Sequence, residues 1–257
     1  NSDHISFSLN LQYRIHPYIA SFVRQRFYEG ALCSDSIMNC PSVLLLRDTS
    51  SAVCIDTSAF IRRDGGQADA SESSIQISVL LNSNIFRESA HGTGCMNEGE
   101  ALLTANKLQR FLRLNEGLEA ADIAVITPYV EQKCAILDKL RANACGPAEQ
   151  VTVDTIDSFQ GKKSLIVVID LVRSDRGRIG FIRDQKRANV AISRAKDLLI
   201  AIGNFNTIRD NSPNPWIDWY SHCAGLESGG LIDKAEDLLH LWPNIGQANV
   251  LPWRQSL

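Results

Sequence analysis

Residues 164–172 read SLIVVIDLV, a nearly continuous apolar run that decides the class of fold. A strand with one solvated face alternates apolar and polar residues, whereas an unbroken apolar run is typical of a strand covered on both faces. DLLIAIG at 197–203 has the same character. These two runs predict buried strands of a parallel sheet.

Helical segments alternate with the predicted strands along the chain. Residues 97–114 predict an amphipathic helix, because Leu102, Ala105, Leu108 and Leu112 fall near one face. Further helices are predicted at 11–30, 129–142 and 185–195, and further strands at 53–56, 122–126 and 151–154. This alternation predicts an α/β fold, a parallel sheet with helices on both faces.

Composition assigns the remaining segments. Residues 61–96 are rich in Gly, Ser and charge and predict a variable loop within a domain at 1–208. Residues 209–257 predict a helical tail packed on that domain, with a Leu-rich helix in AEDLLHLW (235–242). The aromatic residues Trp216, Trp219 and Tyr220 could stack on bases, but packing against the sheet is the commoner use. The chain starts without Met just before a motif, so we expect it to be part of a longer protein.

The overall composition argues against several classes of protein. Hydrophobic residues make up 44% and charged residues 21%, and no run approaches the roughly 18 apolar residues of a membrane span. Seven Cys without a CxxC pair fit reduced intracellular thiols better than a disulfide framework or a zinc site. His222 and Cys223 have no second pair of ligands nearby, so no metal site is predicted.

Basic residues are concentrated in one part of an acidic chain. Residues 173–196 hold eight Lys/Arg and two Asp, a net charge of +6. The rest of the chain therefore carries a charge of −9, which gives the total of −3. At about 100° per residue, Arg187 and Arg194 fall within about 20° of each other on the predicted helix. A basic stripe of this kind indicates either a site for an anionic ligand or a solvated face.

Three segments with possible chemistry follow predicted strands or lie beside them. They are ITPYVEQ (126–132), VDTIDSFQGK (153–162) and the helix at 185–195. Ligands of open α/β sheets bind outside the carboxyl ends of the strands. The hydroxyl, amide and glycine groups of 153–162 suit phosphate oxygens, yet no GxxxxGK[ST] motif occurs anywhere in the chain. A phosphate site here would therefore be only half built.

Five ordered segments carry a resemblance to a known family. LNLQYRIHP (9–17), NEGEA (97–101), ITPYVEQ, TIDSFQGK (155–162) and RANVAISRAK (187–196) resemble the second RecA-like domain of superfamily 1B helicases of the nonsense-mediated-decay type. The resemblance covers residues 9–35 and 96–205. It implies a RecA-like, P-loop NTPase-like sheet that lacks its own phosphate loop.

The resemblance also implies a nucleotide site shared by two domains. ATP with Mg²⁺ would bind between this domain and an N-terminal RecA-like domain, which would supply the phosphate loop and the Mg²⁺ ligands. Tyr13 would stack on adenine, Arg14 would approach the γ-phosphate, and Arg194 would be the arginine finger. Guanidinium suits these roles because it is always charged and binds phosphate oxygens in a fork.

The remaining roles concern coupling and the nucleic acid. Gln160 and Gly161 would lie beside the γ-phosphate and couple it to the strand-binding groove. Arg187 would complete the nucleotide site by bracing the helix or the loop beside Gln160. The residues bordering the groove would be Thr127, Pro128 and Thr155.

Taken singly, several of these residues have simpler explanations. The alternatives are a core position for Tyr13, a surface position for Arg14, a helix start at His16-Pro17, and solvated charge for Arg173 and Lys196.

One departure from the family pattern concerns the residues after QG. Lys163 stands where a Glu is usual, and Leu165 stands where an Asp is usual. An acidic residue there is thought to help hold the nucleotide sugar or brace the site, so its reversal could weaken the use of ATP.

These observations favour the C-terminal motor domain of an ATP-dependent helicase that translocates 5′-to-3′ on single-stranded RNA or DNA, without a membrane partner. This chain alone is not expected to turn over ATP. The alternative is a non-catalytic nucleic-acid-binding or scaffold protein on a degenerate helicase fold, motivated by Lys163. A small-molecule nucleotide-binding or transferase domain is disfavoured, because it would make the five segments coincidental.

Overall fold

The computed structural model describes residues 11–12, 15–31, 33–34, 52–60, 85–92, 94–115, 117–142, 147–175, 177, 179–226 and 230–232. Its central feature is a six-stranded parallel sheet with strand order β10-β3-β9-β8-β6-β7. The strands are β3 (Ala52–Asp56), β6 (Ile123–Thr127), β7 (Thr152–Thr155), β8 (Ser164–Asp170), β9 (Ala195–Gly203) and β10 (Leu231–Ile232). The predicted parallel sheet is confirmed, including both of the apolar runs that predicted it.

The helices and two smaller sheets complete the described structure. The helices are α1 (Pro17–Phe27), α3 (Glu98–Leu114), α4 (Val130–Ala142), α5 (Gln185–Ile192), α6 (Phe205–Asp210) and α7 (Pro215–Ala224). Single 3-10 turns are formed by Thr57–Phe60, Ala120–Asp122, Pro147–Gln150 and Gly180–Arg183. The smaller sheets pair β1 (Leu11–Gln12) with β2 (Cys33–Ser34) and β4 (Glu88–His91) with β5 (Gly94–Asn97).

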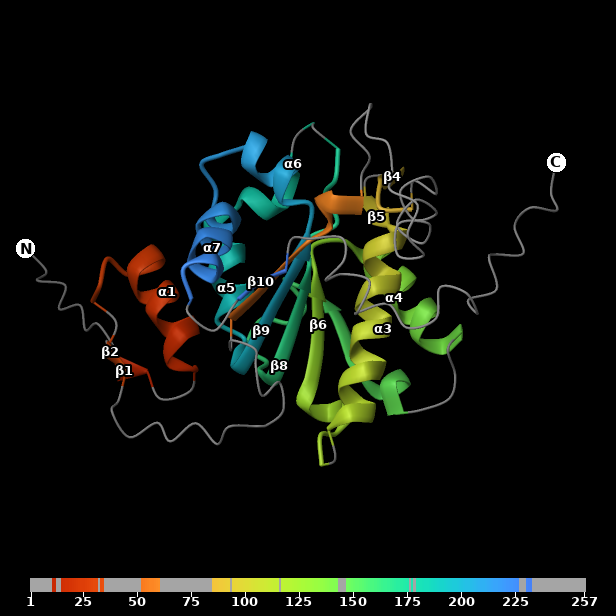
Figure 1. Ribbon diagram of the computed structural model, residues 1–257, viewed down its shortest axis with the longest axis horizontal. Coiled ribbons are helices and arrows are strands. Elements are labelled where there is room, and N and C mark those ends of the chain that lie inside the picture. Colours follow the sequence, from red (N-terminus) through yellow and green to blue (C-terminus); the bar gives the residue numbers. More distant parts are fainter. Residues whose placement is uncertain are drawn as a thin grey trace, which may run out of the picture.

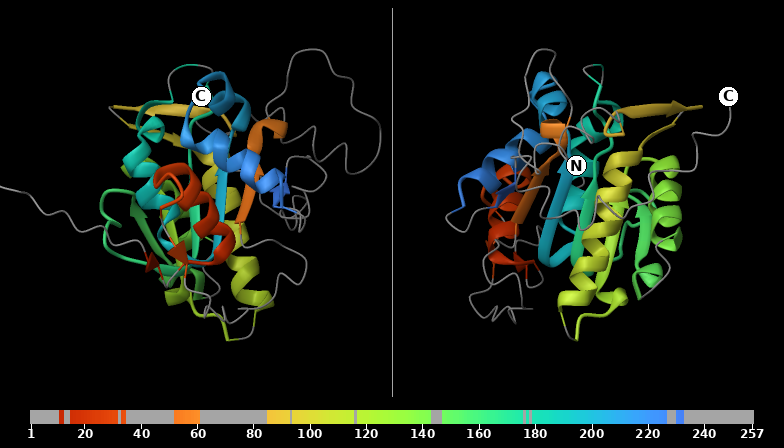
Figure 2. Two further views of the ribbon diagram at one scale, coloured as in Figure 1. Left: turned by 90° about the vertical axis from the view of Figure 1, so that its left-hand side faces the viewer. Right: turned by 45° about the vertical axis from the view of Figure 1, so that its right-hand side comes forward.

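Helices cover both faces of the sheet, as predicted. Helices α1, α5 and α7 lie on one side and α3 and α4 on the other (Figure 1 and Figure 2). Successive residues of a strand point to opposite faces. In β9, Leu199 and Ala201 pack with the first layer, whereas Ile200 and Ile202 pack with the second. Both layers are apolar, so the central residues of β6, β8 and β9 are apolar on both faces.

Two predicted helices are longer than the observed ones. The helix predicted at 11–30 begins only at Pro17. Proline fits the first position of a helix because an N–H group at this position has no acceptor within the helix. His16 precedes it and accepts a hydrogen bond from the N–H of Tyr18 at Nδ1, which confirms the helix start at His16-Pro17. The helix predicted at 185–195 ends at Ile192, so Arg194 lies in the turn before β9. The single helix face proposed for Arg187 and Arg194 is therefore wrong.

The predicted variable loop at 61–96 is wrong for its last part. Residues 88–91 and 94–97 form the antiparallel pair β4–β5, and contacts to the chain after β8 hold this pair in place. Residues 61–84 of the predicted loop lie outside the described residues, and so does the predicted helix in AEDLLHLW.

The aromatic residues near the end of the described chain pack rather than lie exposed. Trp216 and Trp219 are fully buried against α1 and the sheet, and Trp219 meets Phe22 edge-to-face at 5.0 Å between ring centroids. The indole N–H of Trp216 donates to the carbonyl of Ile182 at 2.8 Å. The packing prediction for these tryptophans is confirmed, and α7 belongs to the first helical layer.

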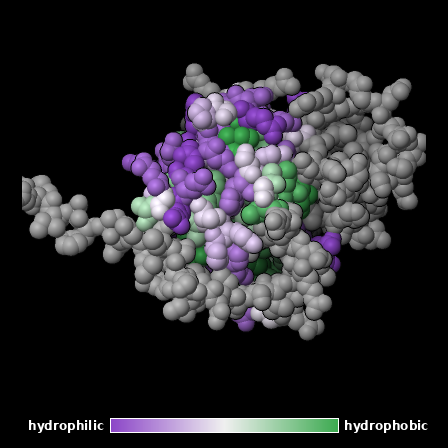
Figure 3. Space-filling model, turned by 60° about the vertical axis from the view of Figure 1, so that its left-hand side comes forward, coloured by the Kyte–Doolittle hydropathy of each residue, from purple (hydrophilic) through white to green (hydrophobic). Residues whose placement is uncertain are grey.

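The outer surface of that layer is largely hydrophilic over its described part, with smaller apolar areas among the polar ones (Figure 3). Among the described residues, no helix is long and apolar enough to cross a membrane.

We expect Trp216→Ala to lower the free energy of unfolding by about 3–5 kcal/mol, because it opens a cavity in the core. Trp216→Phe should cost about 1–3 kcal/mol, since it leaves the buried carbonyl of Ile182 without its donor. The exposed Val130→Ala is the control and should change stability by less than about 0.5 kcal/mol. Urea unfolding curves measure the free energy of unfolding of all three variants. A loss for Trp216→Ala as small as that of the control would mean that α7 does not belong to the folded core.

Candidate nucleotide and nucleic-acid site

Two of the three predicted motif segments meet at the carboxyl edge of the sheet, whereas Arg194 at the end of the third lies at the amino edge, beside Ser164 at the start of β8. Thr127 ends β6 and is paired in register with Thr155, which ends β7. The N–H of Ile156 donates to the carbonyl of Thr127 at 3.0 Å, which joins the two loops where they leave the sheet. Pro128 and Thr155 are partly exposed there, whereas Thr127 is fully buried. Of the three residues expected to border the groove, only Pro128 and Thr155 offer surface in this conformation.

The loop after β7 is a tight turn anchored by two buried apolar side chains, Ile156 and Phe159. The hydroxyl of Thr155 accepts from the N–H of Ser158, and its carbonyl accepts from the N–H of Phe159. Gly161 has φ +85°, a backbone conformation that favours glycine. The turn leaves the side chain of Gln160 exposed beyond its anchors.

Two lysines hold the start of this loop through one carboxylate. Lys133 of α4 and Lys162 each donate to Asp154 at 3.0 Å. Burial opposes ionisation of Asp154, but the hydrogen bonds from the two lysines outweigh it and lower its pKa. The carboxylate is therefore charged and ties α4 to both ends of the loop.

Arg187 braces the middle of the same loop, as predicted. Its Nε and Nη2 atoms donate to the two carboxylate oxygens of Asp157 at 3.0 Å each, and this hydrogen bonding raises its pKa. Asp184 caps α5 by accepting from the N–H of Arg187 at 2.9 Å. The guanidinium also lies 4.8 Å from the ring centroid of Phe181. Helix α5 and the loop at 155–161 therefore move as one unit.

Arg194 lies on the other side of the loop in a different electrostatic setting. Its guanidinium donates to the carbonyl of Val190 at 2.8 Å, the carbonyl of Lys162 at 3.2 Å and the hydroxyl of Ser193 at 2.9 Å. Within the described part of the chain these hydrogen-bond acceptors are all neutral. Burial lowers the pKa of Arg194, yet guanidinium stays protonated in proteins. A half-buried cation without a carboxylate on it is suited to receive an anion.

The first predicted motif is described only in part. Tyr13 and Arg14 lie outside the described residues. The adjoining His16 donates its N–H to the carbonyl of Lys196 at 2.7 Å, so the described half of the motif lies beside the start of β9, close in sequence to Arg194. Lys196 itself is exposed, in agreement with a solvated charge.

A buried polar network at this edge was not predicted from the sequence. Glu100 of α3 and Asp170 at the end of β8 are fully buried and hydrogen-bonded to each other. Glu100 accepts from the hydroxyl of Thr57 at 2.8 Å, and Asp170 accepts from Thr104 at 3.3 Å and from Gln132 at 2.8 Å. Burial raises the pKa of both carboxyls, and the charge of Asp170 raises that of Glu100 further. Two adjacent buried carboxyls are stable when they share one proton.

This carboxyl pair holds a strained backbone. Val172 has φ +70°, a conformation that costs a β-branched residue about 1–3 kcal/mol. Glu100 accepts from its N–H at 2.9 Å, and the side-chain amide of Asn97 donates to its carbonyl at 3.2 Å. The NEGEA segment therefore fixes the path of the chain as it leaves β8.

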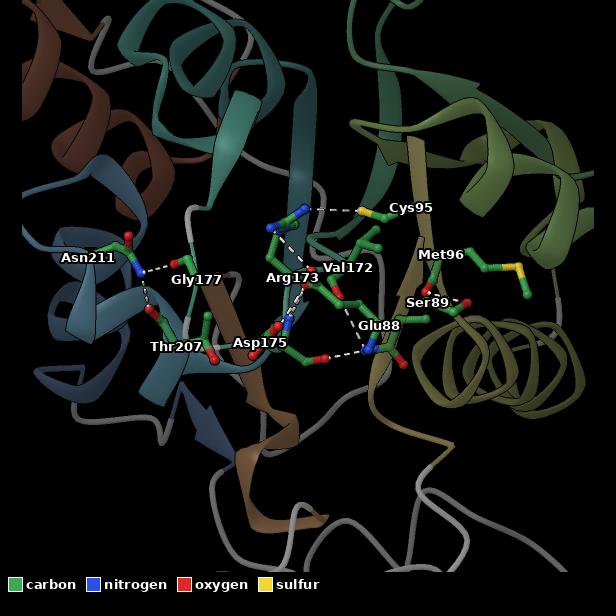
Figure 4. Close-up of polar contacts among 12 residues, drawn as sticks. Glu88, Ser89, Cys95, Met96, Val172, Arg173, Asp175, Gly177, Thr207 and Asn211 are labelled. Carbon is green, nitrogen blue, oxygen red and sulfur yellow. Dashed lines mark hydrogen bonds and ion pairs between the residues drawn. The ribbon is translucent and has the colours of Figure 1, made fainter. Parts of the chain in front are cut away.

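The next residues join that path to the β4–β5 pair (Figure 4). Arg173 forms an ion pair with Glu88 at 3.1 Å and contacts the sulfur of Cys95 at 3.6 Å. Glu88 also accepts from the N–H of Ser174 at 2.7 Å and donates its own N–H to the Ser174 hydroxyl at 2.6 Å. Arg173 was expected to be solvated; this is wrong, because its partner comes from a segment that composition had assigned to a loop.

Together these features define a RecA-like α/β domain with arginine, lysine and hydroxyl groups in the loops beside its sheet. No group of three metal-ligating side chains occurs among the described residues, so these residues offer no cradle for Mg²⁺.

Known proteins agree with this class. The AAA domain family matches residues 1–206. A regulator of nonsense transcripts 1 homolog from Neurospora crassa is 32% identical over 202 residues, covering 76% of this chain and 16% of that protein. ATP-dependent helicase NAM7 from Saccharomyces cerevisiae is 30% identical over 244 residues, covering 93% and 22%. DNA polymerase alpha-associated DNA helicase A from Schizosaccharomyces pombe is 28% identical over 219 residues, covering 84% and 31%.

The chain therefore belongs to the AAA domain family and is a helicase domain of the nonsense-mediated-decay type. It spans between 16% and 31% of the length of the three relatives described above.

The shared proton makes stability depend on pH. Because the folded pKa of Glu100 is raised, the folded state keeps a proton that the unfolded state releases, so stability falls as pH rises above the ordinary value of 4.5. Glu100→Gln should flatten this slope, since a neutral amide has no proton to lose and can still donate to Asp170. Thr57 can turn its hydroxyl to accept from the new amide.

Urea unfolding of the wild type and Glu100→Gln between pH 5 and pH 8 measures how the free energy of unfolding changes with pH. Each unit of difference between the folded and unfolded pKa corresponds to about 1.4 kcal/mol of stability. Thr104→Val is the comparison: it removes one hydrogen bond to Asp170 and costs about 0.5–1.5 kcal/mol. Because that hydrogen bond lowers the pKa of Asp170, its loss should leave the slope as steep as in the wild type or steeper, never flatter. Equal slopes for the wild type and Glu100→Gln would exclude a shared proton.

Proposed function

We propose that this chain is the C-terminal motor domain of an ATP-dependent helicase acting on single-stranded RNA or DNA. The observation that carries the proposal is the setting of Arg194, a half-buried guanidinium whose described hydrogen bonds all go to neutral groups. In an α/β domain without a phosphate loop, such a cation suits the γ-phosphate of a nucleotide held by another domain. Arg194 then stabilises charge on the phosphoryl group in transit.

The same proposal assigns the remaining site residues. Tyr13 stacks on the adenine and Arg14 approaches the γ-phosphate. Both belong to the motif whose His16 donates its backbone N–H to the carbonyl of Lys196. ATP would supply the reactive phosphate, and bound Mg²⁺ would offset its charge. The Mg²⁺ ligands would come from an N-terminal RecA-like domain, as the family resemblance implies. Arg187 acts as a positioning residue, since Asp157 already occupies its guanidinium.

A continuous set of contacts supports coupling between nucleotide and strand. Arg194 donates to the carbonyl of Lys162, and Lys162 follows Gln160 and Gly161 in the tight turn that starts at Thr155. A displacement of Arg194 on binding phosphate is therefore passed to the turn that borders the groove. Alternating grip on the strand during ATP turnover gives translocation, in the 5′-to-3′ direction that the family resemblance suggests.

The relatives support the general activity. NAM7 is named as an ATP-dependent helicase, and the Schizosaccharomyces pombe relative as a DNA helicase. The SMUBP-2 protein of Rattus norvegicus, 28% identical over 212 residues, is named as a DNA-binding protein. Both activities need the same groups on this domain, a phosphate-facing cation and an exposed edge beside the strand.

Arg194→Ala in the full-length protein should lower ATP hydrolysis stimulated by single strands about 10³–10⁵-fold, the usual contribution of an arginine finger. Arg194→Lys should restore little, because an ammonium cannot reproduce the guanidinium fork. The control is Lys196→Ala, an exposed cation two residues away that should keep wild-type turnover. Hydrolysis rates with and without a single strand test this; unchanged turnover in Arg194→Ala would refute the assignment.

A second candidate function is strand binding without ATP use, and the observation that favours it is Lys163 in place of the usual Glu. Lys163 follows directly on Lys162, whose carbonyl accepts from Arg194, so its charge lies beside the proposed phosphate site.

For a working motor, Lys163→Glu in the full-length protein should change ATP affinity by less than about tenfold, since Lys163 is partly exposed and a charge near the surface contributes about 0–1 kcal/mol. For a scaffold, the wild type should bind single strands without measurable ATP binding, and Lys163→Glu should raise ATP affinity. Titration of both proteins with a fluorescent ATP analogue separates the two functions.

A further inference from the structure

Phe181 is an exposed aromatic side chain at the carboxyl edge of the sheet. Its exposed fraction is 53%, and Val130, which directly follows the Tyr129 that Phe181 contacts, is 60% exposed. Burying aromatic surface stabilises a protein, so an aromatic ring left open at a ligand-binding edge is available for a ligand.

Neighbouring segments fix the position of this ring. The ring centroid of Tyr129 lies 6.1 Å from that of Phe181, with the planes tilted by 51°. Gly180 has φ +57°, and a Cβ on it would lie 3.0 Å from the Tyr129 hydroxyl, so the chain before Phe181 packs closely on Tyr129. Tyr129 itself is buried, which raises its pKa to about 12. Phe181 therefore stands on a rigid support.

Another contact of Phe181 is with Arg187 of α5. Arg187 lies over one face of the ring at 4.8 Å and holds Asp157 in the loop at 155–161. Phe181 thus contacts the segment 126–132 and α5, and Arg187 links it to the loop at 155–161. Pro128 and Thr155, the exposed residues at the proposed groove, belong to two of these segments.

The charge around Phe181 suits a polyanion. Arg183 and Lys186 are exposed on either side of the α5 start, with the exposed Asp184 between them. Asp157 already binds Arg187, so of these described cations Arg183 and Lys186 are the ones open to phosphates. An aromatic ring beside cations that can contact phosphates is the usual arrangement for binding single-stranded nucleic acid, in which a base stacks on the ring.

We propose that Phe181 stacks on a nucleobase of the bound single strand, beside the groove at Pro128 and Thr155. This inference rests on the proposed strand binding and adds a base contact to the phosphate contacts. Because every base has a π-face, the contact adds affinity without selecting a sequence.

The test compares two oligonucleotides of equal length, an ordinary single strand and a fully abasic one with the same phosphates. Phe181→Ala in the full-length protein should weaken binding of the ordinary strand roughly 5- to 150-fold and leave binding of the abasic strand unchanged. Phe181→Trp should keep the affinity, and its added fluorescence should be quenched by the ordinary strand only. The control is Tyr18→Ala, which removes an aromatic ring of similar exposure, 48%, from α1.

Each other outcome overturns the inference in a recognisable way. Equal weakening on both strands would mean that Phe181 only holds Arg187 and the loop. Unchanged binding of both strands by Phe181→Ala, while the wild type binds with a steep salt dependence, would refute stacking and leave the proposed function intact. Loss of ATP turnover with strand binding unchanged would identify the surface as a contact with another protein domain. A wild type that binds neither strand would refute both proposals.

Discussion

Every strand of the central sheet runs in the same direction, so all the carboxyl ends meet at one edge. Each connection must return the chain across a face of the sheet, and the returning helices keep both faces dry. Loops far apart in sequence are thereby collected at the carboxyl edge. The turn after β6, the turn after β7 and the chain that leaves β8 lie together for this reason. Arg194 lies at the opposite edge, because it directly precedes β9 and its carbonyl accepts from the N–H of Ser164 at the start of β8. The site exists because the sheet is parallel.

A dry sheet makes the polar groups at its edge expensive unless they are paired. The network of Glu100, Asp170, Gln132 and Asn97 meets that demand with the side chains of four elements, α3, β8, α4 and β5. It also holds Val172 in a left-handed conformation, which directs Arg173 toward Glu88. The exposed residues of the edge therefore stand on a rigid frame, and such a frame keeps functional groups in register with a ligand.

Sequence patterns predicted the sheet because burial on both faces leaves a direct mark, the unbroken apolar runs at 164–172 and 197–203. The bracing role of Arg187 was also accessible, although the helix geometry behind it was wrong: α5 stops at Ile192, two residues before Arg194. The carboxyl pair was not accessible, because Glu100 and Asp170 meet only through the tertiary fold. For the same reason the partner of Arg173 was hidden in a segment whose composition reads as a loop. Local patterns report burial and turns, whereas long-range polar pairs leave no local signal.

The contrast between the two arginines of this segment explains why they are not interchangeable. The carboxylate of Asp157 accepts hydrogen bonds from Nε and Nη2 of Arg187, so the charge of Arg187 is offset within the domain. Arg194 is half-buried, yet its described hydrogen bonds reach only carbonyls and a hydroxyl, which orient the guanidinium without neutralising it. A carboxylate in that place would stabilise the isolated domain, but it would also compete with any phosphate for the same donors. A cation that binds a ligand cannot be paired with a carboxylate of the same domain. The free-energy cost of desolvating the cation is then offset only when the ligand binds. The neutral surroundings of Arg194 therefore favour a site for a transient phosphate over a structural ion pair.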